Sequence, residues 1–195
     1  MFVQLWLNTE RSSRLRKDAA TRREKLIGVA AALFERDGYD IPLEAVIEAA
    51  GLGRGTLYRN FPDRAALMAA VLAHKVMSVE RFVEEHQDDA TLLKTFVRHQ
   101  GLVVTLHSPA ILSLQADASR KQELKLLTER ASVLLETIVV RSCAAGTLRP
   151  DVTVNHLRLV TRMLMTTATE PAEEQAASLD MAIDIVMRGL EPRDA

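Results

Sequence analysis

The stretch that most constrains the fold of this chain is LEAVIEAAGLGRGTLYRNF, residues 43–61. Leu43, Val46, Ile47 and Ala50 recur at i, i+3, i+4 and i+7, which predicts one apolar face of a short helix. Gly51 follows at the position where a helix end needs a residue that tolerates a left-handed backbone. The pattern therefore predicts a short helix that ends in a tight glycine turn.

A second short helix is expected directly after this turn, over residues 54–60. Gly53 is acceptable at its N-cap, and Leu57 and Phe61, four residues apart, turn inward. Two helices joined in this way form a helix-turn-helix, whose second helix can enter a DNA major groove. The surface left over carries side chains suited to phosphates and base edges: Arg54, Thr56, Tyr58, Arg59 and Asn60.

Residues 22–71 also resemble the DNA-binding domain of the tetracycline-repressor (TetR) family. Three runs carry the resemblance: LFERDGYD, AAGLGRGTLYRNF and FPDRAALMAAVL. The resemblance implies an all-α fold of about nine helices, with an N-terminal three-helix DNA-binding domain and a C-terminal helical domain for ligand binding and dimerisation. The expected divisions are a partly basic tail (1–18), the helix-turn-helix domain (19–70) and the C-terminal domain (71–195).

The same resemblance implies roles for individual residues of the helix-turn-helix. Arg54, Gly55 and Thr56 are expected near base edges, and Arg54 is the best candidate for direct readout because its planar fork matches guanine. Tyr58, Asn60 and Arg64 are expected at phosphates, whereas Arg59 is either a phosphate contact or solvated surface. The chain departs from the family where it has Ile41, Pro42 and Gly53 in place of hydroxyl residues.

The charge of the chain is uneven along its length. The formal net charge is −1, but residues 11–25 hold seven basic residues against Asp18 and Glu24, a local excess of five. A basic arm beside a helix-turn-helix suits phosphate contact, and the alternative is a solvated, partly disordered terminus. Residues 1–10 do not resemble the family and are either a disordered tail or the result of a start codon placed too early.

Composition and periodicity predict helices beyond the helix-turn-helix as well. Only 8 Gly and 6 Pro occur among 195 residues, which favours helix nearly throughout. The first helix is expected from about Ala19 to Asp37, and the fourth from Arg64 to about Glu84. Ser108 and Pro109 are expected to break the next helix. Further expected helices span 91–106, 110–116, 119–145, 154–167 and 171 onward.

Two surfaces of the C-terminal domain follow from the resemblance. A cavity for a small-molecule effector is expected among Phe96, His99, Val103, Leu112, Arg130 and Leu134. The alternative is that the apolar members are plain core and Arg130 is solvated. A homodimer is expected, with an isologous two-fold interface. Its residues would be Leu157, Val160, Leu164, Leu179, Ile183 and Val186, and the alternative is that these faces bury within the monomer.

The sequence contains no pattern of catalysis, metal binding or cofactor binding. None of the five histidines pairs with a Cys, a carboxylate or another His at metal-site spacing, and no nucleophile elbow or phosphate-cradling glycine loop occurs. Cys143 is the single cysteine, so no intramolecular disulfide can form. No apolar run approaches the roughly 20 residues that span a bilayer, and a cytoplasmic location is expected.

The sequence thus predicts a homodimeric, sequence-specific transcriptional regulator that is not an enzyme. It is expected to act as a repressor, released from a pseudo-palindromic double-stranded DNA operator by a small-molecule effector. The rival hypothesis is a small-molecule-binding or enzymatic helical bundle that retains the helix-turn-helix only as structure.

Overall fold

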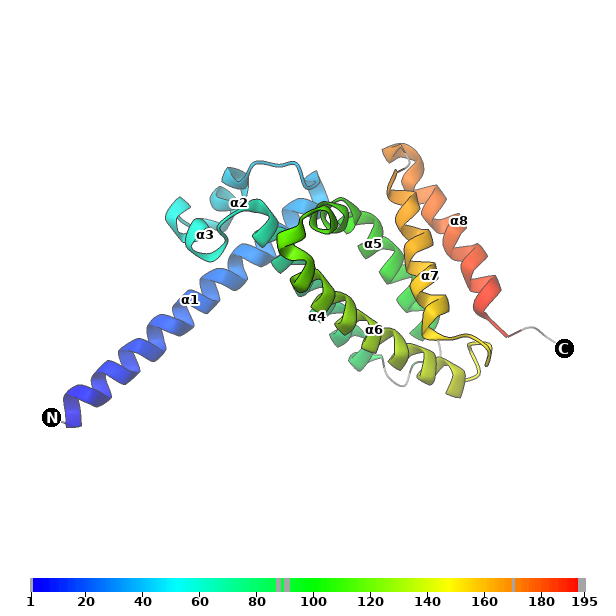
Figure 1. Cartoon of the computed structure of the whole chain (residues 1–195), viewed down its shortest axis with the longest axis horizontal. Coiled ribbons are helices and arrows are strands. Elements are labelled where there is room, and N and C mark those ends of the chain that lie inside the picture. The colour runs from blue at the N-terminus through cyan, green and yellow to red at the C-terminus, as the bar shows by residue number, and fades with distance from the viewer. Residues whose placement is uncertain (1, 87–88, 90–91, 170, 193–195) are drawn as a thin grey trace. The chain divides into compact units, whose positions relative to one another are not determined.

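The computed structural model describes residues 2–86, 89, 92–169 and 171–192, with the backbone alone at 2–15, 99–109, 168–169 and 172. These residues form helices and turns without a strand, which confirms the predicted all-α class. Figure 1 shows the order of the elements: α1 (Phe2–Asp37), α2 (Leu43–Ala50), α3 (Arg54–Asn60), α4 (Arg64–Glu85), α5 (Leu92–Ala116), η1 (Ala118–Arg120), α6 (Lys121–Ala144), α7 (Val154–Met165), η2 (Thr166–Thr169) and α8 (Ala172–Leu190).

The chain divides into two compact units, Met1–Val71 and Leu72–Ala195, and the boundary falls inside α4. In the first unit, α1, α2 and α3 contact one another around a small apolar core. Ile27, Ala30, Ala31 and Phe34 form the buried face of α1. This core fixes the direction in which α3 presents its outer surface.

A glycine turn ends α1. Gly38, at φ 84, follows the helix, and its N–H donates to the carbonyl of Phe34 at 3.0 Å. Tyr39 then packs back on Phe34, with ring centroids 4.5 Å apart. Burial raises the pKa of the Tyr39 hydroxyl, and the charge of Glu35 adds to the effect.

The start of α1 differs from the prediction. The helix begins at Phe2 and not near Ala19, so that boundary is wrong. The chain has no glycine before Gly28 and no proline before Pro42, so no residue interrupts the helix in this segment.

In the second unit, α5 contacts α6, α7 and α8, and α6 contacts α7. The core that these helices share with the last turns of α4 includes Val79, Phe96, Ile138, Leu157 and Ile183. Helix α6 is followed by Gly146 at φ 69, as predicted. Helix α7 begins with a capping box, in which the backbone N–H of Thr153 donates to Nδ1 of His156 at 3.0 Å.

Helix α5 continues through Ser108 and Pro109, so the predicted break there is wrong. A proline inside a helix removes one backbone hydrogen bond but does not have to end the helix when both halves are held by packing. Leu93 and Phe96 are buried on one side of Pro109, and Ala110 and Leu114 are buried on the other. The burial of these side chains stabilises the continuous helix more than Pro109 destabilises it.

The residues predicted for the dimer interface lie inside the subunit. Helices α7 and α8 turn these side chains toward α5, where they join the core of the same chain. Val160 is partly buried and the other five are buried, and their part in a dimer interface stays a prediction: Leu157, Leu164, Leu179, Ile183 and Val186. The alternative stated for the sequence, burial within the monomer, describes the structure.

Within the described part of the chain, no helix is both long and apolar enough to cross a membrane.

Two residues of α6 provide a test of this packing. Ile138 is fully buried, whereas Val140, two residues later, is 68% exposed. Ile138→Ala should lower the free energy of unfolding by about 2–5 kcal/mol because it leaves a cavity. Val140→Ala should change the free energy of unfolding by less than about 0.5 kcal/mol, since the methyl groups of Val140 are largely exposed to water in the folded protein. Urea denaturation measures both values, and equal losses would contradict the described orientation of α6.

Candidate nucleic-acid interface

The turn between α2 and α3 depends on one glycine. Gly51 ends α2 in the left-handed region at φ 61, ψ 35. Its N–H donates to Glu48 at 3.0 Å and that of Leu52 to Ile47 at 3.2 Å, so the last carbonyls of α2 are satisfied. A side chain at position 51 would strain this backbone. Gly53 is extended at φ −78, so its conformation does not require glycine, and no side chain caps α3 there.

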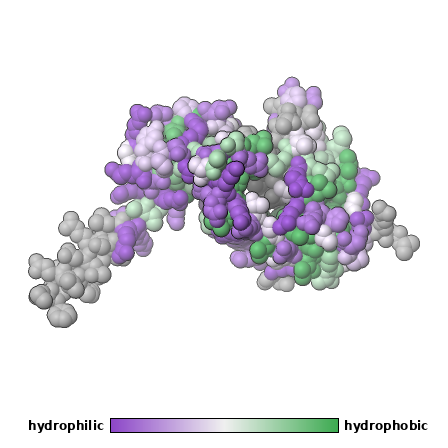
Figure 2. Space-filling view, in the orientation of Figure 1, coloured by the Kyte–Doolittle hydropathy of each residue, from purple (hydrophilic) through white to green (hydrophobic). Residues whose placement is uncertain are grey.

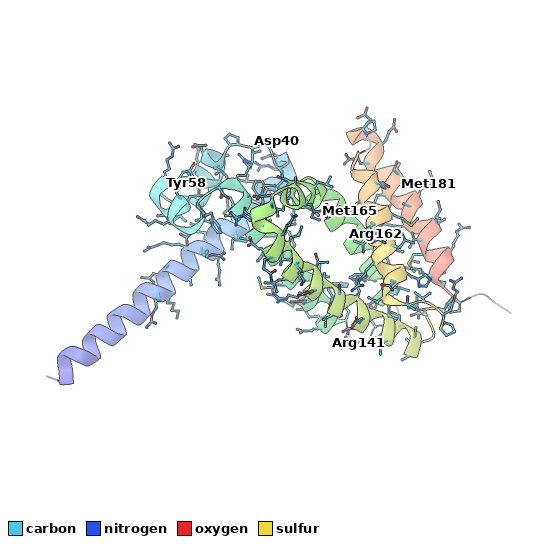
Figure 3. All side chains as sticks on the ribbon, viewed as in Figure 1. Asp40, Tyr58, Arg141, Arg162, Met165 and Met181 are labelled. Carbon is cyan, nitrogen blue, oxygen red and sulfur yellow. The ribbon has the colours of Figure 1, made fainter. Side chains whose placement is uncertain are left out.

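Helix α3 has a buried side and an exposed side. Leu57 is fully buried and Phe61, just after the helix, is 1% exposed, as predicted. Arg23 of α1 lies over the Phe61 ring, 5.0 Å from its centroid. On the outer side Arg54, Gly55, Tyr58 and Arg59 are exposed, and Thr56 and Asn60 are half-buried. Figure 3 labels Tyr58 on this helix, and Figure 2 shows a largely hydrophilic surface over α2 and α3.

Arg54 is held by two weak contacts. Its guanidinium lies 3.5 Å from the Glu44 carboxylate at the start of α2 and 5.6 Å from the centroid of the Tyr58 ring. Both partners of the ion pair are exposed, so solvent screens it and it costs little to break. The contact of Glu44 with Arg54 was not predicted from the sequence. The spacing of ten residues across the turn gives no local signal of the contact.

Thr56 is the partner of two other side chains of α3. Nη2 of Arg59 lies 3.4 Å from the Thr56 hydroxyl, and the amide of Asn60 donates to the Thr56 carbonyl at 2.7 Å. Asn60 therefore stays close to its own helix, with its carbonyl oxygen and one N–H left for other partners. Arg59, with its single long contact, remains adjustable.

Arg64 donates hydrogen bonds to two backbone carbonyls of its own unit. Its Nη1 donates to the carbonyl of Tyr39 at 2.7 Å and its Nη2 to that of Ile41 at 2.6 Å. The guanidinium thus holds the loop that leads into α2, because both of its terminal nitrogens donate to backbone carbonyls of that loop. The Asp63 carboxylate caps α4, since it accepts from the N–H of Ala66 at 2.7 Å. A phosphate contact by Arg64 stays a prediction.

The basic residues near the N-terminus lie on α1 in a stretch that has no buried side. Every residue from Arg16 to Lys25 is exposed. These positions belong to the first unit, as do α2 and α3. Their exposure is compatible with contact to DNA phosphates, and that contact stays a prediction.

The second unit contains a cavity of about 360 Å³ lined by residues of α4, α5, α6 and α7. Of the residues predicted to line an effector site, Phe96 and Leu134 are in its wall. Leu112 is 53% exposed, and Arg130 pairs with Glu80, whose Oε2 lies 2.6 Å from Nη2. The side chains of His99 and Val103 lie outside the described residues.

The geometry of α2, the glycine turn and α3 defines the class of this first unit as a helix-turn-helix DNA-binding domain. A family model described as bacterial regulatory proteins of the tetR family matches residues 26–71. A helix-turn-helix-type transcriptional regulator of Staphylococcus aureus is 30% identical over 76 residues, which are 38% of this chain and 41% of that protein. The chain thus matches less than half the length of this curated relative.

Solved structures match over most of the chain. A TetR transcriptional regulator from Streptomyces coelicolor is 26% identical, with a TM-score of 0.63 over 88% of this chain and 99% of the other. A TetR regulatory protein from Mycobacterium vanbaalenii is 22% identical, with a TM-score of 0.66 over 91% and 99%. Residues 26–71 therefore form a DNA-binding domain of the TetR type, and the fold of the chain is similar to that of TetR-family transcriptional regulators.

The hydrogen bonds of Arg64 can be tested by a change that keeps its charge. Arg64→Lys retains a cation but cannot reach both carbonyls with a planar fork. It should therefore lower the free energy of unfolding by about 1–3 kcal/mol. Arg59→Lys is the matched control and should leave stability unchanged, since Arg59 is exposed. Thermal or urea unfolding measures both, and wild-type stability in Arg64→Lys would show that the contacts to Tyr39 and Ile41 contribute nothing.

Proposed function

We propose that the protein is a sequence-specific DNA-binding repressor that acts as a homodimer and is released from its operator by a small molecule. The observation that carries the proposal is the outer surface of α3. Exposed Arg54, Tyr58 and Arg59 stand on a helix whose opposite side is fixed by buried Leu57 and Phe61. A rigid helix with exposed cations and donors suits a major groove.

Within this proposal Arg54 reads a base and its neighbours position the helix. The exposed Arg54–Glu44 pair is weak, so the guanidinium can exchange the carboxylate for a guanine edge. Tyr58, Arg59 and Asn60 reach toward phosphates. Gly55 supports close approach: a Cβ there would meet only Nη1 of Arg59 at an ordinary 3.7 Å, so the protein itself does not require glycine at this position.

The start of α2 replaces the family's missing hydroxyl contacts with backbone. Pro42 is the N-cap and has no side-chain cap to offer. The first N–H groups of α2 and the positive end of its dipole remain as an anion-binding feature. A phosphate of the operator would lie there, and Glu44 would have to stay paired with a cation or turn away from it.

The dimer is proposed to use the outer faces of α7 and α8. TetR-family regulators typically dimerise. Leu159 and Met163 on α7 are each 48% exposed, and Met181 and Ile185 on α8 are 65% and 61% exposed. Each pair is spaced i, i+4 and so shares one helix face. Figure 2 shows hydrophobic patches over these helices, and Figure 3 labels Met181. In this proposal these four exposed residues form the dimer interface, in place of the six residues expected from the sequence.

A two-fold dimer would present its two recognition helices to successive major grooves, roughly 34 Å apart on a pseudo-palindrome. The effector would bind in the cavity of the second unit, and α4 contributes both to that cavity and to the first unit. Binding of the effector would shift α4 and weaken DNA binding. Because coupling is reciprocal, DNA would weaken effector binding by the same factor.

Selection of genomic fragments by the purified protein at near-physiological salt tests DNA recognition. A single enriched palindrome is expected, and Arg54→Ala should weaken binding to it by about tenfold or more and relax the preference at one base position. Arg36→Ala is the control, because Arg36 is exposed at the end of α1 and pairs with adjacent Asp37. Unchanged specificity in Arg54→Ala would contradict the readout role, and no binding even at low salt would contradict the regulator.

The dimer proposal is tested by placing like charges on its face. Met181→Lys together with Ile185→Lys should give monomers, because burying two cations without partners costs more than the interface gains. Asp180→Lys is the matched charge control, because Asp180 is exposed on the same helix and residues adjacent in sequence, such as Asp180 and Met181, do not share a face. Sedimentation equilibrium measures the association state. If the double variant remains a dimer with the affinity of the wild type, the interface lies elsewhere.

A further inference from the structure

The wall of the cavity in the second unit is apolar in its interior. Leu72 and Val76 of α4, Phe96 of α5, Leu127 and Leu134 of α6, and Met165 of α7 contribute to it. Its volume of about 360 Å³ lies within the range of roughly 300–1,000 Å³ typical of small-molecule sites. Such a wall favours a ligand with an apolar body, since that body leaves water on binding.

The charged side chains described in this wall are all basic. They are Lys75 on α4 and Arg158 and Arg162 on α7. The two arginines are four residues apart, so they lie on one face of α7, and both are exposed, so they stand at the solvent side of the cavity. Figure 3 labels Arg162 and Met165 on this helix. With no carboxylate among the described lining residues, the cavity repels a cationic ligand and attracts an anionic one.

The groove beside the cavity has the same sign of charge. It shares Arg158 with the cavity and adds Lys121 and Lys125 of α6. The acidic residue described in it is Glu129, which already lies 3.7 Å from the Lys125 ammonium. An anion that approaches the cavity from this side therefore meets a basic surface.

The polar but uncharged residues of the wall do not supply competing donors. The hydroxyls of Thr128, Ser132 and Thr161 donate to carbonyls of their own helices at 2.8, 2.8 and 3.0 Å. A hydroxyl has one proton, so these groups are left as acceptors. Nη1 of Arg158 donates a hydrogen bond to Oδ1 of Asn155 at 3.2 Å. Donors for a ligand are therefore carried by Arg158, Arg162 and Gln115.

We propose that this cavity binds an amphipathic organic acid. The apolar body of the ligand lies against Leu72, Phe96 and Leu134, and its single carboxylate or sulfonate group lies at Arg158 and Arg162. The exposed position of the arginines lets the acid group remain partly hydrated while the body is buried, so neither a bare inorganic anion nor a neutral hydrocarbon satisfies both parts of the site. The proposal rests on the proposed function in taking this ligand as the effector.

A matched pair of dyes separates charge from apolar burial. Anilinonaphthalene sulfonate carries one acid group, and N-phenylnaphthylamine is the same ring system without it. Both are titrated by fluorescence into the full-length protein. Arg158→Ala with Arg162→Ala should weaken the sulfonate by about tenfold or more, because charge-assisted hydrogen bonds are lost. The same change should leave the amine unaffected, and lysine at both positions should restore part of the sulfonate affinity.

Two further variants locate the dye. Ala131→Phe fills the cavity, since Ala131 is in its wall, and should abolish binding of both dyes. Arg188→Ala removes an exposed cation of α8 that pairs with Asp184 and should change neither. If Ala131→Phe does not fold, the variant with both Arg158→Ala and Arg162→Ala still tests whether the two arginines bind the acid group. The inference is overturned if that double variant weakens both dyes equally or neither, or if a folded Ala131→Phe protein binds both as the wild type does.

This result is independent of the test of DNA recognition. Selective sulfonate binding in a protein that binds no DNA would contradict the regulator proposal and leave the ligand class standing. Specific DNA binding by a protein whose affinity for the sulfonate ignores the two arginines would contradict the ligand class alone.

Discussion

The recognition surface depends on the burial of Leu57 and Phe61 against the first unit. Helix α3 has only seven residues, too short to be stable alone, so its form and direction come from packing. The two side chains are almost fully buried, worth roughly 1.5–3 kcal/mol each. With Leu57 buried in this way, Arg54 and Tyr58 remain exposed to solvent. The Gly51 turn sets the angle at which α3 leaves α2, and Arg64 secures the loop before α2.

In the second unit, helices have more apolar surface than the shared core buries. Helices α7 and α8 each carry two apolar faces, and the packing against α5 takes the face of Leu157, Leu164 and Ile183. What remains exposed, with Met163 and Ile185, is the face left for another molecule. The cavity arises in the same way, where the side chains of four helices do not fill the space between them. Its basic edge comes from α7, the helix that also supplies core residues.

Local signals predicted the first unit well. The i, i+3, i+4 pattern, the glycine at the left-handed position and the inward Leu57–Phe61 pair all proved correct, because each depends on residues within one or two turns. The contacts of Arg64 with Tyr39 and Ile41 could not be predicted, since they join residues 23 and 25 positions apart. The continuation of α5 through Pro109 was missed for a similar reason: burial on both sides outweighs the loss of one backbone hydrogen bond.

The sequence alone determined the all-α class, the helix-turn-helix and the side chains that α3 offers to solvent, because helical periodicity and glycine conformation are properties of neighbouring residues. Only the tertiary structure decided which apolar face of α7 and α8 is core and which is exposed, and that Arg158 and Arg162 flank a cavity. Periodicity shows that a face is apolar, but not what covers it. Burial is a relation between segments far apart in the chain, so it exists only once the helices have packed.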